Sequence, residues 1–155
     1  MEALSQPRNT SQISIFLIGN NPIDLGSIYD KIKAINSEEY RTEIGFELKG
    51  LYNRIRKFRP SCIFIDDNLQ KVQIKKILKR LASNSETRDI PITVIKNSNY
   101  SEGYSEAQDY LLKEKLTSEK LYRTIKNSMR LKRMQLFIIK KYRKNKSLLA
   151  KLLNN

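Results

Sequence analysis

The sequence contains no histidine and only one cysteine. The missing histidine excludes histidine-based acid–base catalysis, histidine metal ligands and a phosphohistidine carrier. The cysteine, Cys62, lies inside an apolar run, so we expect a small buried side chain in a reducing compartment. No apolar stretch is long enough to span a membrane, and residues 1–11 are polar without a signal-like apolar region. These features predict a cytoplasmic protein.

Two common binding motifs are also missing. Gly19 and Gly26 do not form the glycine-rich fingerprint of a dinucleotide- or phosphate-binding loop. No helix-turn-helix pattern follows the main part of the chain. We expect a protein that is not an enzyme and that has no bound cofactor.

The positive charge of the chain is concentrated at one end. The formal net charge is +14, and residues 130–155 contain nine Lys or Arg and no Asp or Glu. The first 129 residues hold 21 basic and 16 acidic residues, a net charge of +5. A basic segment of this kind can meet nucleic acid, an anionic membrane or an acidic protein.

Strand-like and helix-like patterns alternate along the chain. Helical spacing of apolar residues predicts helices over 24–35, 51–58 and 72–81, and Thr117 is expected to cap a last helix. Short apolar runs predict five strands, over 13–18, 42–46, 62–65, 91–95 and 110–112. Such alternation predicts an α/β domain with a parallel sheet covered on both faces. We assign it to residues 12–129, between a disordered polar segment (1–11) and a basic amphipathic helix (130–155).

One predicted strand carries a carboxylate at its end. Residues 62–65 (Cys-Ile-Phe-Ile) have the length and branching of a strand buried on both faces, and Asp66 follows directly. In open parallel sheets, ligands bind beyond the carboxyl ends of the strands. Asp66 is therefore the first candidate for a functional residue.

Four segments together resemble one known family. They are residues 17–25 (LIGNNPIDL), 60–66 (PSCIFID), 89–95 (DIPITVI) and 109–113 (DYLLK). In this order they resemble the strand ends of response-regulator receiver domains, such as the chemotaxis regulators. The resemblance covers roughly residues 13–129. It implies a flavodoxin-like, doubly wound parallel sheet of five strands in the order 2-1-3-4-5.

The resemblance assigns roles to four residues. Asp66 lies at the phosphoacceptor position, and Lys113 lies at the position of the phosphate-binding lysine. Asn68 would lend a backbone carbonyl to a metal ion. Tyr110 is similar to the aromatic residue that acts as a switch in the family.

Three other positions depart from the family pattern. The acidic pair that holds Mg²⁺ in the family is replaced by Gly19 and Asn20, and the hydroxyl residue after the fourth strand is replaced by Lys96. The predicted pocket then has Asp66 against Lys113 and Lys96, a net charge of +1. Since Mg²⁺ prefers carboxylate oxygens, we expect weak or no Mg²⁺ binding and a degenerate pseudo-receiver. Lys96 either joins Asp66 and Lys113 in a cluster or points into solvent.

The segment before the last strand is shorter than in the family. Lys96 and Lys113 are 17 positions apart, and residues 97–105 are rich in turn-forming residues. We therefore expect a shortened fourth helix. That helix belongs to the face that receiver domains use for output.

The basic tail shows a change of helical face. The apolar stripe of Leu121, Ile125 and Met129 is followed by a new stripe that starts at Leu131. A step of two residues turns about 200° around a helix, so the tail should face away from the domain core. We favour a dimerising or docking helix, for instance a homodimer through residues 131–152. Nucleic acid and an anionic membrane are the other candidate partners.

Together these patterns favour a protein of two-component (phosphorelay) signalling. We expect a pseudo-receiver that works through contacts with signalling proteins, either a histidine kinase or a downstream effector. Two other functions remain open at this point. The chain could be a working response regulator phosphorylated on Asp66, or a nucleic-acid-binding regulator that uses its basic tail.

Overall fold

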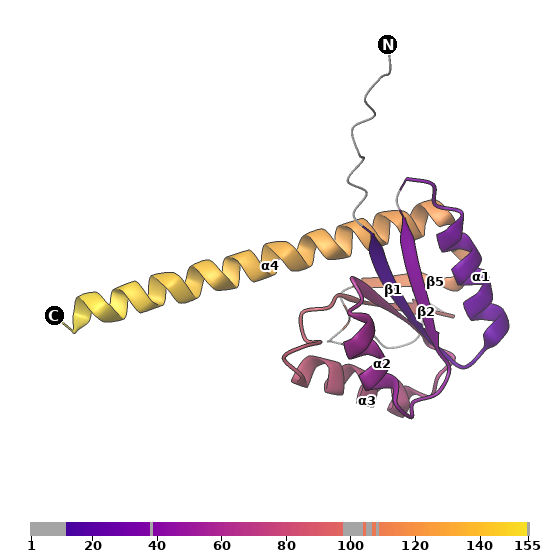
Figure 1. Ribbon diagram of the computed structural model, residues 1–155, viewed down its shortest axis with the longest axis horizontal. Helices are drawn as coiled ribbons and strands as arrows, with labels where there is room; N and C mark the ends of the chain where they lie inside the picture. The colour runs from indigo at the N-terminus through magenta and orange to yellow at the C-terminus, as the bar shows by residue number, and fades with distance from the viewer. Residues whose placement is uncertain (1–11, 38, 98–103, 105–106, 108, 155) are drawn as a thin grey trace, which may run out of the picture.

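Five parallel strands form the centre of the protein (Figure 1). The computed structural model describes residues 12–37, 39–97, 104, 107 and 109–154. The strands are β1 (Ile13–Ile18), β2 (Tyr40–Gly45), β3 (Cys62–Asp66), β4 (Ile92–Lys96) and β5 (Asp109–Leu112). Their order in the sheet is β2-β1-β3-β4-β5, and each neighbouring pair is parallel. The predicted order 2-1-3-4-5 is confirmed.

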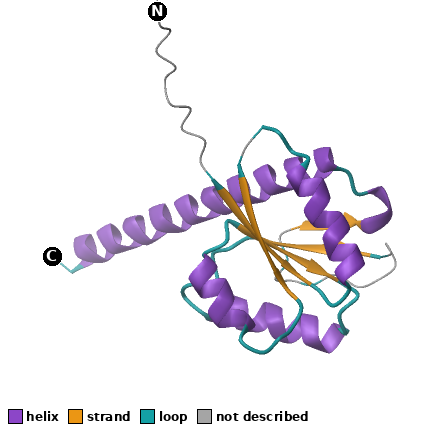
Figure 2. Ribbon diagram, turned by 45° about the vertical axis from the view of Figure 1, so that its right-hand side comes forward, coloured by secondary structure: helices purple, strands orange, loops and turns teal. Residues whose placement is uncertain are grey.

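Helices cover both faces of this sheet (Figure 2). They are α1 (Pro22–Lys33), α2 (Leu51–Phe58), α3 (Lys71–Ser83) and α4 (Ser118–Leu153), with a short 3₁₀ helix, η1 (Lys113–Lys115), before α4. Helices α1 and α4 pack on one face, and α2 and α3 pack on the other. This is the doubly wound α/β arrangement that the sequence predicts.

Capping residues explain where two of the helices begin. The Asn21 side chain accepts hydrogen bonds from the backbone N–H groups of Ile23 and Asp24, and Pro22 occupies the first helical position. Helix α1 therefore starts two residues before the predicted Asp24. Thr117 accepts a hydrogen bond from the N–H of Lys120, as predicted for the cap of the last helix.

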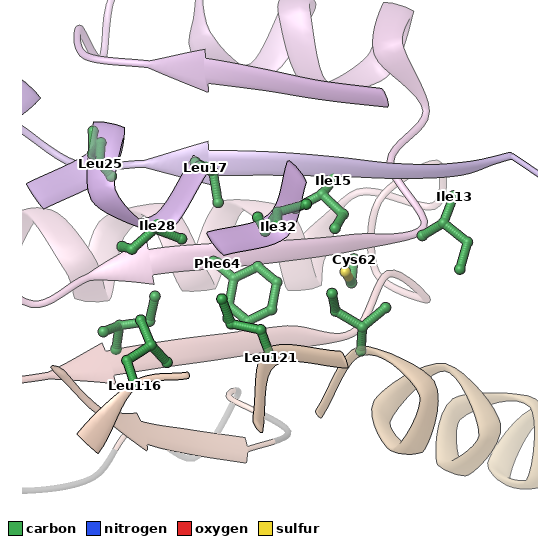
Figure 3. Packing of buried hydrophobic residues seen from close by; sticks show 12 residues of the cluster. Ile13, Ile15, Leu17, Leu25, Ile28, Ile32, Cys62, Phe64, Leu116 and Leu121 are labelled. Carbon is green, nitrogen blue, oxygen red and sulfur yellow. The ribbon is translucent and has the colours of Figure 1, made fainter. Parts of the chain in front are cut away.

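The core has two layers because successive strand residues point to opposite faces of the sheet. In β1, Ile15 and Leu17 face α1 and α4, whereas Phe16 and Ile18 face α2 and α3. Figure 3 shows the first layer around Phe64. Its buried members are Ile13, Ile15, Leu17, Leu25, Ile28, Ile32, Cys62, Phe64, Ile95, Leu116, Leu121 and Ile125.

Cys62 is part of that first layer (Figure 3). Its side chain is buried, and burial raises the pKa of the thiol to about 12. A thiol with such a pKa is almost never a thiolate at neutral pH, so it is chemically inert. Cys62 therefore acts as a packing residue.

The last helix continues far beyond the sheet (Figure 1). Met129 still packs against the core, but Leu131 is 52% exposed and residues 133–154 are all exposed. The predicted boundary between residues 129 and 130 thus falls inside one continuous helix. Among the described residues, no helix is long and apolar enough to cross a membrane. The prediction of a shortened helix within 97–105 lies largely outside the described residues.

Two glycines provide a test of the core packing. A Cβ atom at Gly45 would lie 2.7 Å from Leu51 Cδ1 and 3.0 Å from Phe16 Cε1, and both of these side chains are fully buried. We expect Gly45→Ala to lower the free energy of unfolding by about 1–3 kcal/mol through overpacking. Urea denaturation measures the change.

Gly26→Ala is the matched control. A Cβ atom at Gly26, inside α1, would meet no atom within 4 Å. We expect this variant to be more stable than the wild type by about 0.5–1 kcal/mol, because alanine favours the helix. Equal effects of the two substitutions would contradict the packing around Gly45.

Candidate functional site

The parallel sheet brings the predicted site residues to one edge. Asp66 ends β3 and lies opposite Ile95 of β4, while Lys96 lies opposite Leu112 of β5. Lys113 follows β5 directly. All these strand ends point the same way, so their side chains converge at the carboxyl edge of the sheet.

Asp66 is the buried centre of the site. The residue is 1% exposed. Its Oδ1 lies 2.8 Å from the Lys113 ammonium and accepts a hydrogen bond from the Asn68 backbone N–H at 3.0 Å. Its Oδ2 is also buried and has no hydrogen-bond partner among the described residues. Lys113 therefore provides the counter-charge that lets this carboxylate stay in the interior.

Asp24 is a second acidic residue at this site, and the sequence motifs did not point to it. Its Oδ2 lies 3.2 Å from the Lys113 ammonium and accepts a hydrogen bond of 2.7 Å from the Asn68 side chain. The cap at Asn21 puts Asp24 in the first turn of α1. There the helix dipole also favours a negative charge. The Lys113 ammonium thus bridges two carboxylates.

Three asparagines surround this ion-pair cluster. The Asn20 side chain lies 3.5 Å from the backbone carbonyl oxygen of Asn68, to which it donates. The Asn97 side chain donates to both Asn68 and Asp67, at 2.6 Å each. Asn68 therefore ties the loop after β3 to the loops after β1 and β4.

Asp67 takes part in this network through Asn97. Its Oδ1 accepts hydrogen bonds from the backbone N–H and the side chain of Asn97. Partial burial raises the pKa of Asp67, and the nearby Asp66 charge adds to this, whereas the Asn97 N–H bond opposes it. Asp67 thus links β3 to the segment that follows β4.

Lys96 lies beside Tyr110 and does not join the ion-pair cluster. Its ammonium is 5.0 Å from the centre of the Tyr110 ring. The partners of Asp66 Oδ1 are Lys113 and Asn68, and Oδ2 accepts no hydrogen bond within the described part of the chain. Of the two alternatives for Lys96, the structure therefore does not form the cluster with Asp66 and Lys113. A cation over the face of an aromatic ring is a favourable contact, and the Lys96 side chain makes this contact with Tyr110.

The Tyr110 hydroxyl is held by the backbone of a nearby residue. It donates a hydrogen bond of 2.6 Å to the carbonyl oxygen of Tyr104 and accepts one from the Tyr104 N–H. Both contacts fix the ring of Tyr110 in one orientation. The role of this residue as a switch remains a prediction.

Structures of known proteins share the fold of this chain. The receiver domain of a sensor histidine kinase from Pseudomonas aeruginosa, with magnesium coordinated in its active-site cleft, superposes with a TM-score of 0.63 at 18% identity, over 77% of this chain and 98% of that one. The chain has the receiver fold. A chemotaxis protein from Vibrio cholerae gives a TM-score of 0.64 at 15% identity, over 76% and 99% of the two chains. A receiver-modulated diguanylate cyclase from Pelobacter carbinolicus gives 0.62 at 18% identity, over 79% and 97%. Comparisons of the sequence with protein-family profiles and with curated proteins found no match.

The observed charges correct the predicted charge of this site. Asp24 and Asp66 face one ammonium, so these three groups carry a net charge of −1. The expected value of +1 was wrong because it omitted Asp24 and included Lys96. The site is therefore not an anion-binding pocket by its charge alone.

The side chains nevertheless do not fit a resident Mg²⁺ ion. Magnesium requires oxygen ligands at about 2.0–2.1 Å in octahedral geometry. Gly19 and Asn20 supply no carboxylate, and Lys113 already occupies the space between Asp24 and Asp66. In the described part of the chain, no group of three or more acidic, cysteine or histidine side chains is placed to hold a metal. The Lys113 ammonium thus lies between the two carboxylates and neutralises part of their charge.

Removal of Lys113 should reveal how strongly the site depends on it. We expect Lys113→Met to lower the free energy of unfolding by about 3 kcal/mol, because the buried Asp66 carboxylate loses its counter-charge. The double variant Asp66→Asn/Lys113→Met should recover most of this loss, since it removes the fully buried charge and Asp24, the other partner of Lys113, is partly exposed. Urea denaturation of both proteins measures the effect.

Lys115→Met is the control, because Lys115 lies two residues away and is exposed. Its effect should stay within about 0.5 kcal/mol. If Lys113→Met and Lys115→Met destabilise the protein equally, the ion pair with Asp66 has no structural importance.

Proposed function

We propose that this chain is a pseudo-receiver of two-component signalling, in which Lys113 replaces the metal ion as the counter-charge of Asp66. The observation that supports the proposal is the Lys113 ammonium, at 2.8 Å from Asp66 and 3.2 Å from Asp24. In a site that used Mg²⁺, the cation would neutralise these carboxylates. Here a covalently attached cation does so at all times.

The proposal makes the site a fixed element of the fold. Because Lys113 follows β5 and Asp24 begins α1, the ion pairs connect two loops to β3 without any phosphoryl group. The loops would keep one arrangement, and the protein would act through contacts with signalling proteins in the cytoplasm. A histidine kinase or a downstream effector would be the partner, and no catalysis is needed.

A second function is favoured by one specific observation. Asp66 Oδ2 is a buried carboxylate oxygen without a hydrogen-bond partner among the described residues. Such an oxygen keeps its lone pairs free, and it could accept a phosphoryl group, as in a working response regulator, if the site opens to a phosphodonor. Phosphoryl transfer relies on cations to neutralise developing charge, so slow transfer with Lys113 alone is the competing hypothesis.

Treatment with acetyl phosphate and Mg²⁺ separates the two functions. We expect the intact mass of the wild-type protein to stay unchanged. A gain of one phosphoryl group that disappears in Asp66→Ala would instead establish a working response regulator. The Asp66→Ala protein also shows whether any modification at other residues contributes.

A variant designed to gain Mg²⁺ binding tests whether missing carboxylates prevent the wild-type site from holding the ion. Asn20→Asp adds a carboxylate next to the Asn68 carbonyl oxygen, whereas a side chain at Gly19 would press on Leu25 and Asp66 at 3.0–3.1 Å. We expect Mg²⁺ at ten times its Kd to stabilise Asn20→Asp by about 1.4 kcal/mol, which raises Tm by a few degrees. Thermal unfolding with and without Mg²⁺ measures the shift.

Asn53→Asp is the matched control, because it makes the same change of charge at an exposed position on α2. Neither this variant nor the wild type should respond to Mg²⁺. A wild-type shift as large as that of Asn20→Asp would refute the replacement of the metal by Lys113.

A further inference from the structure

The outer part of α4 is exposed to solvent along its length. Its residues 131–153 continue beyond the sheet, and almost all of them are exposed (Figure 1). They rise about 35 Å along the helix axis. Several large apolar side chains on this segment are 50–78% exposed, among them Ile138 (61%) and Leu149 (61%). Exposed apolar side chains in such number mark an interaction surface.

The side chains of this segment are sorted around the helix. At about 100° per residue, most apolar side chains lie within an arc of about 200°, which we call the apolar arc. Its members are Leu131, Met134, Phe137, Ile138, Ile139, Tyr142, Leu148, Leu149, Leu152 and Leu153. The rest of the circumference, the cationic arc, carries Lys132, Arg133, Lys140, Arg143, Lys144 and Lys151.

A few residues depart from this sorting. Leu136 lies in the cationic arc, and Gln135, Lys141, Asn145 and Lys146 lie in the apolar arc. The Lys141 ammonium lies 5.2 Å from the centre of the Phe137 ring, so its charge is partly accommodated there. Long lysine stems near the boundary can also extend outward and carry their charge away from an apolar phase.

The charges of the helix decide between its candidate partners. Residues 120–155 contain no Asp or Glu. A second copy of the helix would bring two sets of cations together, and a two-helix seam is narrower than an arc of about 200°. Nucleic acid would contact the cationic arc and leave the apolar arc in water. Of these three partners, an anionic lipid surface satisfies both arcs, because apolar side chains enter the acyl boundary while cations remain among the headgroups.

We propose that residues 131–153 lie flat on an anionic lipid surface, with the apolar arc facing the acyl chains. This inference is independent of the proposed pseudo-receiver function. The sequence patterns alone favoured a different partner, a dimerising or docking helix, for instance a homodimer through residues 131–152. The helix would bind at the membrane surface without crossing it, and the receiver domain would remain in water.

Two tryptophan variants of the full chain test this placement. The sequence contains no tryptophan, so a single introduced one reports only its own position. Ile138 and Leu136 are two residues apart and point about 200° away from each other. With vesicles of phosphatidylcholine and phosphatidylglycerol, the emission of Ile138→Trp should shift to the blue and resist acrylamide quenching. Leu136→Trp should change little.

Vesicle sedimentation gives the affinity. Ile138→Gln should weaken binding to the anionic vesicles by about tenfold or more, because one buried apolar side chain is lost. Leu136→Gln, the matched change in the cationic arc, should bind as the wild type does. Binding should also fall with added salt and be weaker on pure phosphatidylcholine.

Three results would overturn the proposal. Equal binding to neutral and anionic vesicles would show that the cations have no role. The tryptophan emission of Ile138→Trp could also shift to the blue without vesicles, and more so at higher protein concentration. Together with a dimer mass in equilibrium sedimentation, this result would show that the apolar arc binds a second copy of the chain. Binding of a DNA duplex without binding of vesicles would assign the cationic arc to nucleic acid.

Discussion

The ion pair between Lys113 and the buried Asp66 is the contact on which the site depends. Asp66 ends the central strand β3, and a carboxylate at that depth is unfavourable without a positive partner. Lys113 supplies it from the residue after β5, and the same ammonium holds Asp24 at the start of α1. One side chain thus links three segments that are far apart in the sequence. The asparagines around it complete the hydrogen bonds of these loops.

Much of the fold follows from local patterns in the sequence. The apolar runs of β1 and β3 are buried on both faces, and such runs are the strongest signal of a parallel sheet. The start of α1 was less clear, because Asn21 and Pro22 determine it and apolar periodicity does not report a cap. Strand β2 begins at Tyr40, earlier than predicted, since its partly exposed residues lack a continuous apolar run.

The candidate site was predictable only in part. Asp66 and Lys113 could be placed together because both follow strands of one parallel sheet. Asp24 was missed although a signal existed, since the capping residues before it place its carboxylate in the first turn at the same edge. The position of the Lys96 side chain could not be predicted, because a long flexible side chain can contact several groups that are brought together only in the folded chain. In the structure its ammonium lies over the ring of Tyr110 and not beside Asp66.

The continuity of α4 has a mechanical consequence. Its first half is anchored by Leu121 and Ile125 in the core, and no glycine or proline interrupts the helix before Leu153. The outer half is therefore an arm that continues directly from the anchored part of the helix. A partner that binds one side of this arm therefore also determines how the sheet is rotated about the helix axis. The direction in which the carboxyl edge is presented to other molecules is then determined by which side of the arm is held.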